Sequence, residues 1–521
     1  MKKLLLLASF FWYLLPPLDT DLGWHLRYGQ QIFQNQAVFK TNQIGFFLSN
    51  YQWTHAYSLY QLIVFTLFKF FGFWGLIITN ALLMTTVFYF LLRRYQKKEF
   101  FLFFACIFLI AISHSTTNLG LRSQLFSFLG VSFLFDFLLS KNKFKNRAVF
   151  FLPLIFVFWA NFHGAFVLGL ALLFFGLIEK LFQKKKKQAF ILAKIISLSF
   201  LATLINPFGL RLYAEIWRHT WYPLNQLIAE WVAPGKIGVL LIIISLSLTA
   251  IGFLSQKKNL QKKPFIFLTL TWLFFLFLSL RARRNLPLFG LASIHLWGHL
   301  FYELHPKTSK AMNMKTPPRW ALTPRGWQQR TNQSYSSSTS EESPPLAGPP
   351  SEENNFAKKR KTRAITKIIA IALILIALAW RLISLPPIQF NWSNICQTSH
   401  WPLPCQAVEY LQKKPDLCPK IFNAYEWGGY LSWHLPQSKT FVDGRMPAWP
   451  TPEGKSPYTI YLEIIQGLSG FEEKLKKYNP SCLLLARGTG IDKKMESSNQ
   501  YGWEKIYDDG LAVIYLPKST N

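Results

Sequence analysis

The most constraining feature of this sequence is a series of long apolar runs separated by short clusters of basic residues. Clusters of Lys and Arg follow apolar runs at 93–98, 141–147, 180–187 and 257–263. Cytoplasmic loops of membrane proteins retain Lys and Arg, whereas exported loops do not. Placing the N-terminus and all of these clusters in the cytoplasm requires about eleven crossings of roughly 20 residues each, with the C-terminus outside. We therefore expect a polytopic α-helical membrane bundle in residues 1–305. Composition agrees, because 51% of the residues are hydrophobic and only 16% are charged.

The expected crossings are the apolar runs that lie between the basic clusters. They are 4–17, 74–92, 99–113, 122–140, 148–160, 164–180, 189–205, 238–254, 264–280, 286–303 and a last helix at 364–385.

One further apolar run, 57–71, is expected not to cross the membrane. If it crossed, the cluster at 93–98 and the next two clusters would move to the outer side. We expect a helix lying on the outer surface instead, with Lys69 and aromatic side chains at the depth of the lipid headgroups. The first exported loop then spans residues 18–73.

The formal net charge of +32 does not indicate a nucleic-acid-binding face. From Pro387 to the C-terminus, 14 Lys and Arg residues balance 13 Asp and Glu residues, so the excess lies between the apolar runs. Charge in that position reflects membrane topology. We expect the lipid bilayer as a partner and no nucleic acid.

Acidic residues are rare in the bundle, which makes their positions informative. Only seven occur in the first 302 residues, and the outward-facing ones are Asp19, Asp21, Glu215 and Glu230. The same face receives the turn "RARRN" at 281–285, whose three arginines oppose the positive-inside tendency. Such a violation predicts an anion site.

Each of these residues also has a structural interpretation. Asp19 or Asp21 can cap the expected helix "LGWHLRYGQQIF", because Asp at a helix N-terminus satisfies free backbone N–H groups. His163 can be a polar residue in a tight turn. The arginines of 281–285 can bind lipid headgroups nonspecifically.

Several motifs resemble the GT-C-type integral membrane glycosyltransferases, in a bacterial branch that uses polyprenyl-phosphate sugars. The resemblance rests first on "DTDLGWHLRYGQQIF" and "WTHAYSLYQLIVFTLFKFFG" in the first exported loop. It extends to "RSQLFSFL", "NFHGAFVLGL", "INPFGLRLY", "RARRNLPLF", "FNAYEWGGYLSWHLP" and "FVDGRMPAW".

The resemblance implies transfer of a sugar from a polyprenyl-phosphate donor to a hydroxyl of a glycan, lipid or protein on the outer face of the cell membrane, with inversion at the anomeric carbon. A carboxylate of Asp19 or Asp21 would be the general base. Arg283, Arg284 and Arg122 would bind the donor phosphate. Alternatively, Asp19 and Asp21, with or without Glu230, would hold a divalent cation such as Mg²⁺ or Mn²⁺. The expected substrate-binding residues are His25, His55, Asn161, His163, Glu230, Asn285, Asp443 and Arg445.

Two regions follow the bundle. Residues 306–363 are rich in Ser, Pro, Glu and Asn, and we expect a disordered cytoplasmic linker. Residues 386–521 alternate strand-like and helical runs, which predicts a small extracytoplasmic α/β domain. The strand-like runs are 420–425, 440–445, 481–487 and 511–517, and the helical runs are 405–414, 427–435 and 458–478. In this domain, Asp443 and Arg445 of "VDGR" can pair with each other or contact the acceptor.

Four of the five cysteines lie in this exported region, where disulfides are permitted. The pairing that we expect first joins Cys396 to Cys405.

Two other function classes compete with a transferase. A transporter or flippase for a lipid-linked or anionic solute could use the same acids and arginines, although its charges should lie near the bilayer midplane. The chain could also be a non-catalytic membrane scaffold that displays the C-terminal domain.

Overall fold

The computed structural model describes residues 1–95, 98–117, 120–140, 151–224, 228–260, 265–303, 351–397, 402–498 and 501–518. The basic cluster at 141–147 and the expected linker up to residue 350 lie outside these residues.

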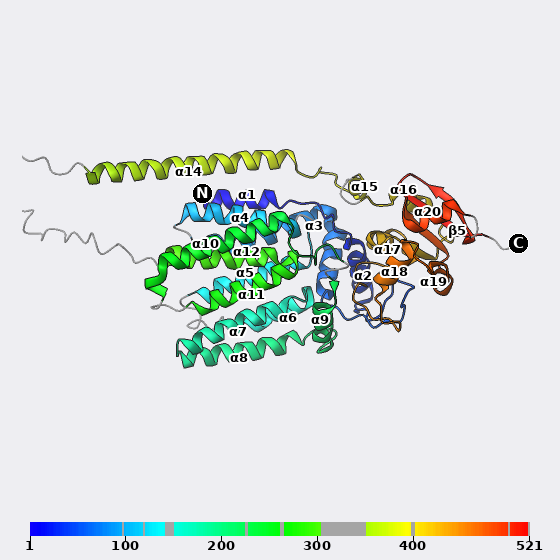
Figure 1. Ribbon diagram of the computed structural model, residues 1–521, viewed down its shortest axis with the longest axis horizontal. Coiled ribbons are helices and arrows are strands. Elements are labelled where there is room, and N and C mark those ends of the chain that lie inside the picture. The colour runs from blue at the N-terminus through cyan, green and yellow to red at the C-terminus, as the bar shows by residue number, and fades with distance from the viewer. Residues whose placement is uncertain are drawn as a thin grey trace, which may run out of the picture.

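The first part of the chain is a bundle of helices that run roughly along the long axis of the molecule (Figure 1). Within the described residues, each expected crossing contains a helix. These helices are α1 (Lys2–Trp12), α3 (Ser58–Arg94), α4 (Glu99–Thr117), α5 (Gln124–Leu139), α6 (Leu152–Phe162), α7 (Phe166–Phe182), α8 (Lys186–Thr203), α10 (Lys236–Leu260), α11 (Ile266–Arg281), α12 (Leu286–Gly298) with the short η5 (His299–Glu303), and α14 (Ser351–Ile383). By length and composition, α3 and α10 are suited to cross a membrane, while α4, α5, α6 and α11 are shorter apolar helices.

Helix α3 consists of two helices that meet at Gly72. The backbone of Gly72 is non-helical, with φ 58° and ψ −152°, a conformation that glycine adopts readily because it lacks a Cβ. The kink separates the run 57–71 from the expected crossing at 74–92. The direction of the chain therefore changes where the sequence predicted the surface helix to end.

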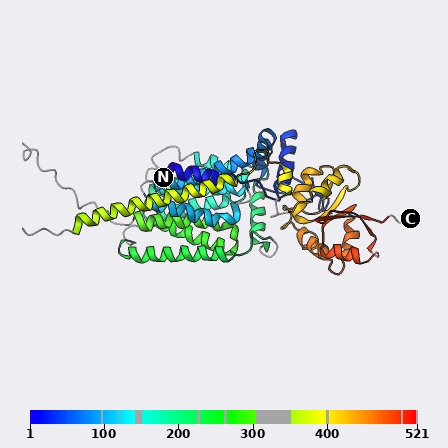
Figure 2. The same cartoon turned by 90° about the horizontal axis from the view of Figure 1, so that it is seen from above.

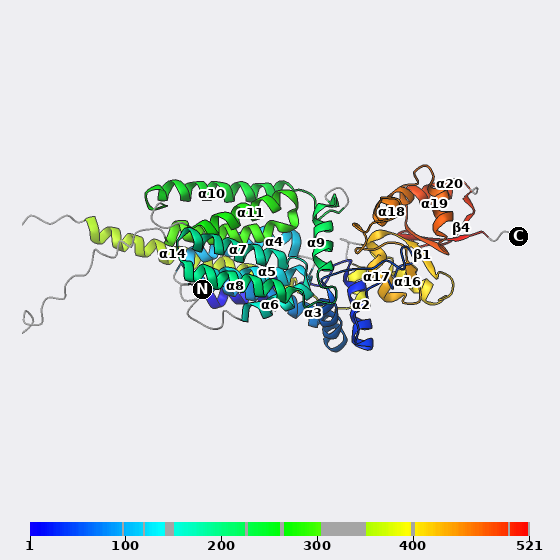
Figure 3. The same ribbon diagram turned by 90° about the horizontal axis from the view of Figure 1, so that it is seen from below.

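Two shorter helices lie at the end of the bundle next to the C-terminal domain. Helix α2 (Leu22–Asn35) was expected, whereas α9 (Arg211–Trp221) was not. Figure 3 shows α9 running across the ends of the bundle helices. Its side chains Trp217 and Trp221 are exposed.

The linker prediction was wrong at its C-terminal end, because α14 already begins at Ser351. Residues 351–363 include Ala, Lys and Arg, which have high helix propensity and extend the apolar helix that follows.

The C-terminal domain is built on a mixed five-stranded sheet in the order β2-β1-β3-β5-β4. β1 pairs in parallel with β2 and β3, and β5 pairs antiparallel with β3 and β4. The strands are β1 (Lys420–Asn423), β2 (Lys439–Thr440), β3 (Cys482–Ala486), β4 (Trp503–Asp508) and β5 (Ala512–Pro517). The helices around them are α15 (Trp392–Cys396), α16 (Cys405–Gln412), η7 (Tyr425–Trp427), α17 (Gly428–His434), α18 (Pro457–Ile465), α19 (Phe471–Tyr478) and α20 (Gly490–Ser497).

The expected long helix at 458–478 is instead the two helices α18 and α19. Gly467 and Gly470, between them, have φ values of 65° and 79°, so the chain is left-handed at both positions and the helix cannot continue. Strand β4 and helix α20 were not predicted.

The sheet separates two apolar cores. Successive strand residues point to opposite faces, so Leu484 and Ile514 join the core that continues into the helix bundle, whereas Leu483 and Val513 join a second core. This second core also contains residues of the first exported loop, namely Trp24, Tyr28, Ile44, Phe47 and Trp53. The C-terminal domain and the first exported loop therefore fold around a shared interior.

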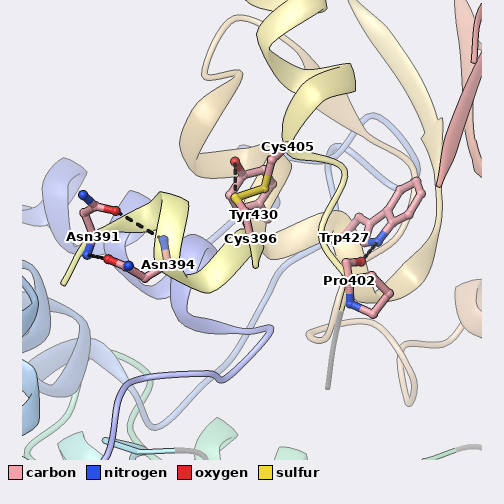
Figure 4. The surroundings of a disulfide bond; sticks show 7 residues. All are labelled: Asn391, Asn394, Cys396, Pro402, Cys405, Trp427 and Tyr430. Atoms are coloured by element: carbon pink, nitrogen blue, oxygen red, sulfur yellow. Dashed lines mark hydrogen bonds between the residues drawn. A yellow bond between two sulfur atoms is a disulfide. The ribbon is translucent and has the colours of Figure 1, made fainter. Parts of the chain in front are cut away.

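Both disulfides lie in the C-terminal region. Cys396 and Cys405 are bonded as predicted, and Cys418 is bonded to Cys482. Figure 4 shows the first bridge beside Tyr430, whose hydroxyl lies 3.9 Å from the sulfur of Cys396. It fastens the segment that joins α14 to the domain.

Candidate active site

The loops that carry the candidate residues meet at the end of the bundle facing the C-terminal domain. They are the segments before α2 and before α5, the segment before α10, and the turn η4 (Arg283–Asn285) after α11. Figures 1 and 2 both place the C-terminal domain directly beyond this end.

Arg122 is the centre of an ion-pair network. Its Nε donates to Oδ2 of Asp19 at 2.9 Å. Its Nη1 and Nη2 donate to the two carboxylate oxygens of Glu230 at 3.1 and 2.8 Å. The sequence assigned Arg122 to the donor phosphate, and in the structure each of its three nitrogens donates to one of these carboxylates. Here Arg122 joins the first exported loop to the loop before α10.

Asp21 lies next to this network without belonging to it. No ion pair joins Asp21 to the described part of the chain, and its Oδ1 accepts a hydrogen bond from Trp24 Nε1 at 2.9 Å. Its backbone N–H donates to Oδ1 of Asp19 at 3.3 Å, which keeps the two carboxylates close.

Helix capping does not explain the acid pair. Asp21 stands at the N-cap position of α2, yet its side chain makes no capping hydrogen bond. Asp19 is directed to Arg122 instead. Capping would satisfy a free N–H of the first helical turn, and neither carboxylate does so.

The three acids have different electrostatic states. Burial, together with the negative charge of Asp19, raises the pKa of Asp21 to about 7. Burial also raises the pKa of Asp19, although Arg122 opposes the shift. For Glu230, burial acts to raise the pKa, but Arg122 and Arg284 outweigh it and hold the pKa at about 2. At neutral pH, Asp21 is thus the carboxyl poised to exchange a proton.

The arginines of η4 border the same cluster. The backbone N–H of Arg283 donates to Val232 O at 2.9 Å, and that of Arg284 donates to Glu230 O at 3.3 Å. The Arg284 guanidinium stacks over Trp231, 4.7 Å from the ring centroid. The buried Nε of Arg283 has no acceptor within the described ranges. A buried unpaired donor of this kind fits an anionic ligand.

The histidines contribute neutral polar groups. Burial, reinforced by Arg284 and Arg122, lowers the pKa of His163 to about 3, and its Nδ1 is hydrogen bonded to Ser127 Oγ at 2.8 Å. Burial likewise lowers the pKa of His25, and that of His55 to about 3. His25 and His163 have Arg122 as an electrostatic neighbour, which places both beside the network.

Two predicted substrate-binding asparagines serve the backbone instead. Asn161 Nδ2 donates to Val157 O and to Ile205 O, each at 2.8 Å. Asn285 Nδ2 donates to Leu278 O at 3.0 Å, in the last turn of α11. Both amide groups therefore donate to backbone carbonyls in or next to the bundle helices.

Asp443 and Arg445 adopt the paired alternative that the sequence left open. Their side chains are fully buried, with Arg445 Nη2 2.6 Å from Asp443 Oδ2. Arg445 also donates to Tyr28 OH at 2.6 Å and to Asn42 Oδ1 at 3.0 Å. A buried charge requires such partners, and together they link the C-terminal domain to the first exported loop.

Sequence reasoning missed two tyrosines of the site. The phenol of Tyr57 interacts electrostatically with Arg284, Asp21 and Arg122, and burial raises its pKa. Tyr60 lies one turn further along α3, and its OH donates to Leu121 O at 3.1 Å. In the sequence, both tyrosines lie close to His55 in "HAYSLY", and this proximity could have identified them as candidate site residues.

The expected cation site built from all three acids is not assembled among the described residues. Among the described residues, no group of three or more His, Cys, Asp and Glu side chains is close enough to hold a metal ion. Arg122 bridges Asp19 and Glu230. A cation shared by these two acids would have to displace the guanidinium.

No protein-family model and no curated protein matches the sequence. Among solved structures, the chain is similar to the crystal structure of ArnT from Cupriavidus metallidurans bound to undecaprenyl phosphate. The TM-score is 0.48 and the sequence identity 12%, over 99% of this chain and 97% of that chain.

Proposed function

We propose that this chain is an integral membrane glycosyltransferase, which moves a sugar from a polyprenyl-phosphate donor to an acceptor hydroxyl on the outer face of the membrane. The observation that carries the proposal is the carboxylate of Asp21. It has a pKa of about 7, and it shares one cluster of loops with the arginine turn η4. A base and an anion site in one place are the parts that this reaction needs.

The surface of the bundle supports a membrane location. Large apolar side chains cover α10, where Ile237 is 73% exposed and Leu254 is 76% exposed. Extended apolar surfaces of this kind mark contact with lipid or another protein. With the basic clusters assigned to the cytoplasm, the Asp21 cluster and the C-terminal domain lie outside.

In the proposed reaction, the acceptor oxygen attacks the anomeric carbon while Asp21 takes the hydroxyl proton. The bond between the anomeric carbon and the phosphate oxygen breaks, and its electron pair leaves with the phosphate. A single displacement inverts the anomeric configuration. Asp21 is assigned this role rather than Asp19, because Asp19 is paired with Arg122.

The leaving phosphate is assigned to Arg283 and Arg284. The backbone N–H of Arg284 donates to Glu230 O and that of Arg283 donates to Val232 O. Arg283 also carries a buried Nε that has no acceptor among the described residues. Guanidinium groups match phosphate oxygens through their forked donors. Arg122 acts indirectly, because its charge is offset by Asp19 and Glu230.

The test is transfer by the purified protein in nanodiscs, with radiolabelled polyprenyl-phosphate sugars and hydroxyl acceptors. We expect release of polyprenyl phosphate together with a glycosylated product, and loss of both in Asp21→Asn. Absence of transfer from every donor, with net movement of lipid or solute in vesicles containing the protein, would favour a transporter and overturn the proposal.

A further inference from the structure

The turn Asp443–Gly444–Arg445 of the C-terminal domain lies directly against Asp21. A Cβ built on Gly444 would fall 1.9 Å from Oδ1 of Asp21. Gly444 is not among the residues with positive φ, so its backbone does not require glycine. The close approach to the carboxylate is what excludes a side chain here.

The same turn is fastened to the helix that Asp21 precedes. Within the turn, Asp443 Oδ1 accepts from the backbone N–H of Arg445 at 3.0 Å and from its Nε at 2.8 Å. Arg445 then donates to Tyr28 OH. Tyr28 lies two helical turns after Asp21, on the face of α2 that also carries Trp24. The turn therefore contacts the start of α2 at Asp21, through Gly444, and the same face of the helix two turns later at Tyr28, through Arg445.

A second close approach leaves little freedom between the two parts. A Cβ on Gly23 would lie 1.9 Å from Gly429 O, and a Cβ on Gly429 would lie 2.1 Å from Thr20 O. The segment around Asp21 is thus pressed onto α17. A shift of either part is transmitted to the other, because packed interiors have no room to absorb it.

We infer that the turn Asp443–Gly444–Arg445 is a positioning element for the reaction, which holds the Asp21 carboxylate in place and makes the C-terminal domain a part of the catalytic unit. The inference rests on the proposed function for its catalytic consequence. It gives Gly444 and Arg445 an indirect role, through Asp21, without contact to substrate.

The first test is a double-mutant cycle that needs no activity. Thermal unfolding in nanodiscs at pH 7 compares the wild type, Gly444→Ala, Asp21→Ala and the double variant. We expect Gly444→Ala to lower the melting temperature in the wild type but not in the Asp21→Ala background, where the new methyl group meets no carboxylate. The matched control is Gly235→Ala, because a Cβ at Gly235 has open space and its φ is not positive.

If Gly444→Ala lowers the melting temperature equally in the wild type and in Asp21→Ala, the inference is overturned, because the added methyl group would then clash with a group other than the Asp21 carboxylate. If Gly444→Ala cannot be purified, its recovery on adding Asp21→Ala supports the inference, and failure in both backgrounds overturns it.

The second test measures the kinetics of sugar transfer. In Gly444→Ala we expect a fall in kcat of roughly 10²-fold, as for other small misplacements of a catalytic group, with little change in the donor KM. The acidic limb of the pH profile should move to lower pH, because a displaced Asp21 is less buried. The charged groups that bear on Asp21 are Asp19, Arg122 and Glu230. The titratable phenols of Tyr57, Tyr60 and Tyr425 also interact with it electrostatically.

An acidic limb identical to that of the wild type would overturn the positioning role. No transfer by the wild-type protein would overturn the proposed function instead, and the thermal cycle would still decide whether the turn holds Asp21.

Discussion

Arg122 donates through Nε to Oδ2 of Asp19 at 2.9 Å, and the two residues are 103 positions apart in the chain. This contact divides the acid pair into two unlike groups. Asp19 is paired with the Arg122 guanidinium. Asp21, two residues later, accepts a hydrogen bond from Trp24 Nε1 and has no ion-pair partner among the described residues. The predictions below follow from this division.

Asp21→Asn is expected to lower kcat by roughly 10²–10⁴-fold, the usual contribution of a general base. In the wild type, kcat should fall as the pH drops below about 7, because the carboxyl is then protonated. Initial rates at saturating donor measure both effects. The control is Glu215→Gln, since Glu215 lies on α9 and pairs with Arg218 at 2.9 Å, outside the cluster. A similar loss in both variants would contradict the assignment.

Asp21 should also link stability to pH. Its pKa is about 7 in the folded protein and 3.8 in its unperturbed state, so the folded protein binds the proton more tightly. The resulting stabilisation is complete below about pH 4 and is lost as the pH rises through 7. We expect the melting temperature of the wild type, relative to Asp21→Asn, to fall between these pH values. If the melting temperatures of the two proteins change with pH in parallel, protonation of Asp21 does not contribute to the stability of the folded protein.

Loss of a phosphate-binding arginine should weaken donor binding. Arg283→Ala and Arg284→Ala are each expected to raise the donor KM by roughly tenfold or more, the cost of a hydrogen bond to a charged group. Steady-state kinetics with varied donor measure the change. Arg281→Ala is the matched control, because Arg281 is exposed and stacks over Trp221. Equal effects at Arg281 and Arg284 would indicate nonspecific attraction.

The buried pair of Asp443 and Arg445 should stabilise the joint between the two parts of the molecule. Arg445→Met is expected to cost about 3–5 kcal/mol of unfolding free energy, because it leaves Asp443 buried without a partner. The double variant Asp443→Leu with Arg445→Met should lose less than Arg445→Met alone. Denaturant unfolding in detergent measures both, and a double variant that loses the sum of the single effects would argue against the pair.

Transfer should continue at an undiminished rate in the presence of EDTA. The reason is that Arg122 already bridges Asp19 and Glu230, two of the three acids that were expected to hold a divalent cation. Rates before and after exhaustive chelation provide the measurement. Loss of activity that Mg²⁺ or Mn²⁺ restores would show that a cation displaces the guanidinium during the reaction.

Much of the helical architecture could be predicted, because it depends on local composition. Apolar runs bounded by basic clusters predicted every helix of the bundle except α9 within the described residues, and Gly72 marks the end of the surface run 57–71. The disulfide between Cys396 and Cys405 was also predicted, from four cysteines in a region expected to be exported. Helix α9 was missed because it is short and amphipathic, so its apolar residues are interrupted by polar ones and form no continuous apolar run in the sequence.

The sequence by itself determined which elements form and which loops carry the acids and the arginines, because apolar length and charge placement act locally. Only the tertiary structure decided what each polar group does. It paired Arg122 with Asp19 and Glu230, left Asp21 as the carboxyl with a pKa of about 7, and buried Arg445 against Tyr28. These outcomes depend on distances of a few ångströms between residues far apart in the chain, and electrostatic and hydrogen-bond energies vary steeply over such distances.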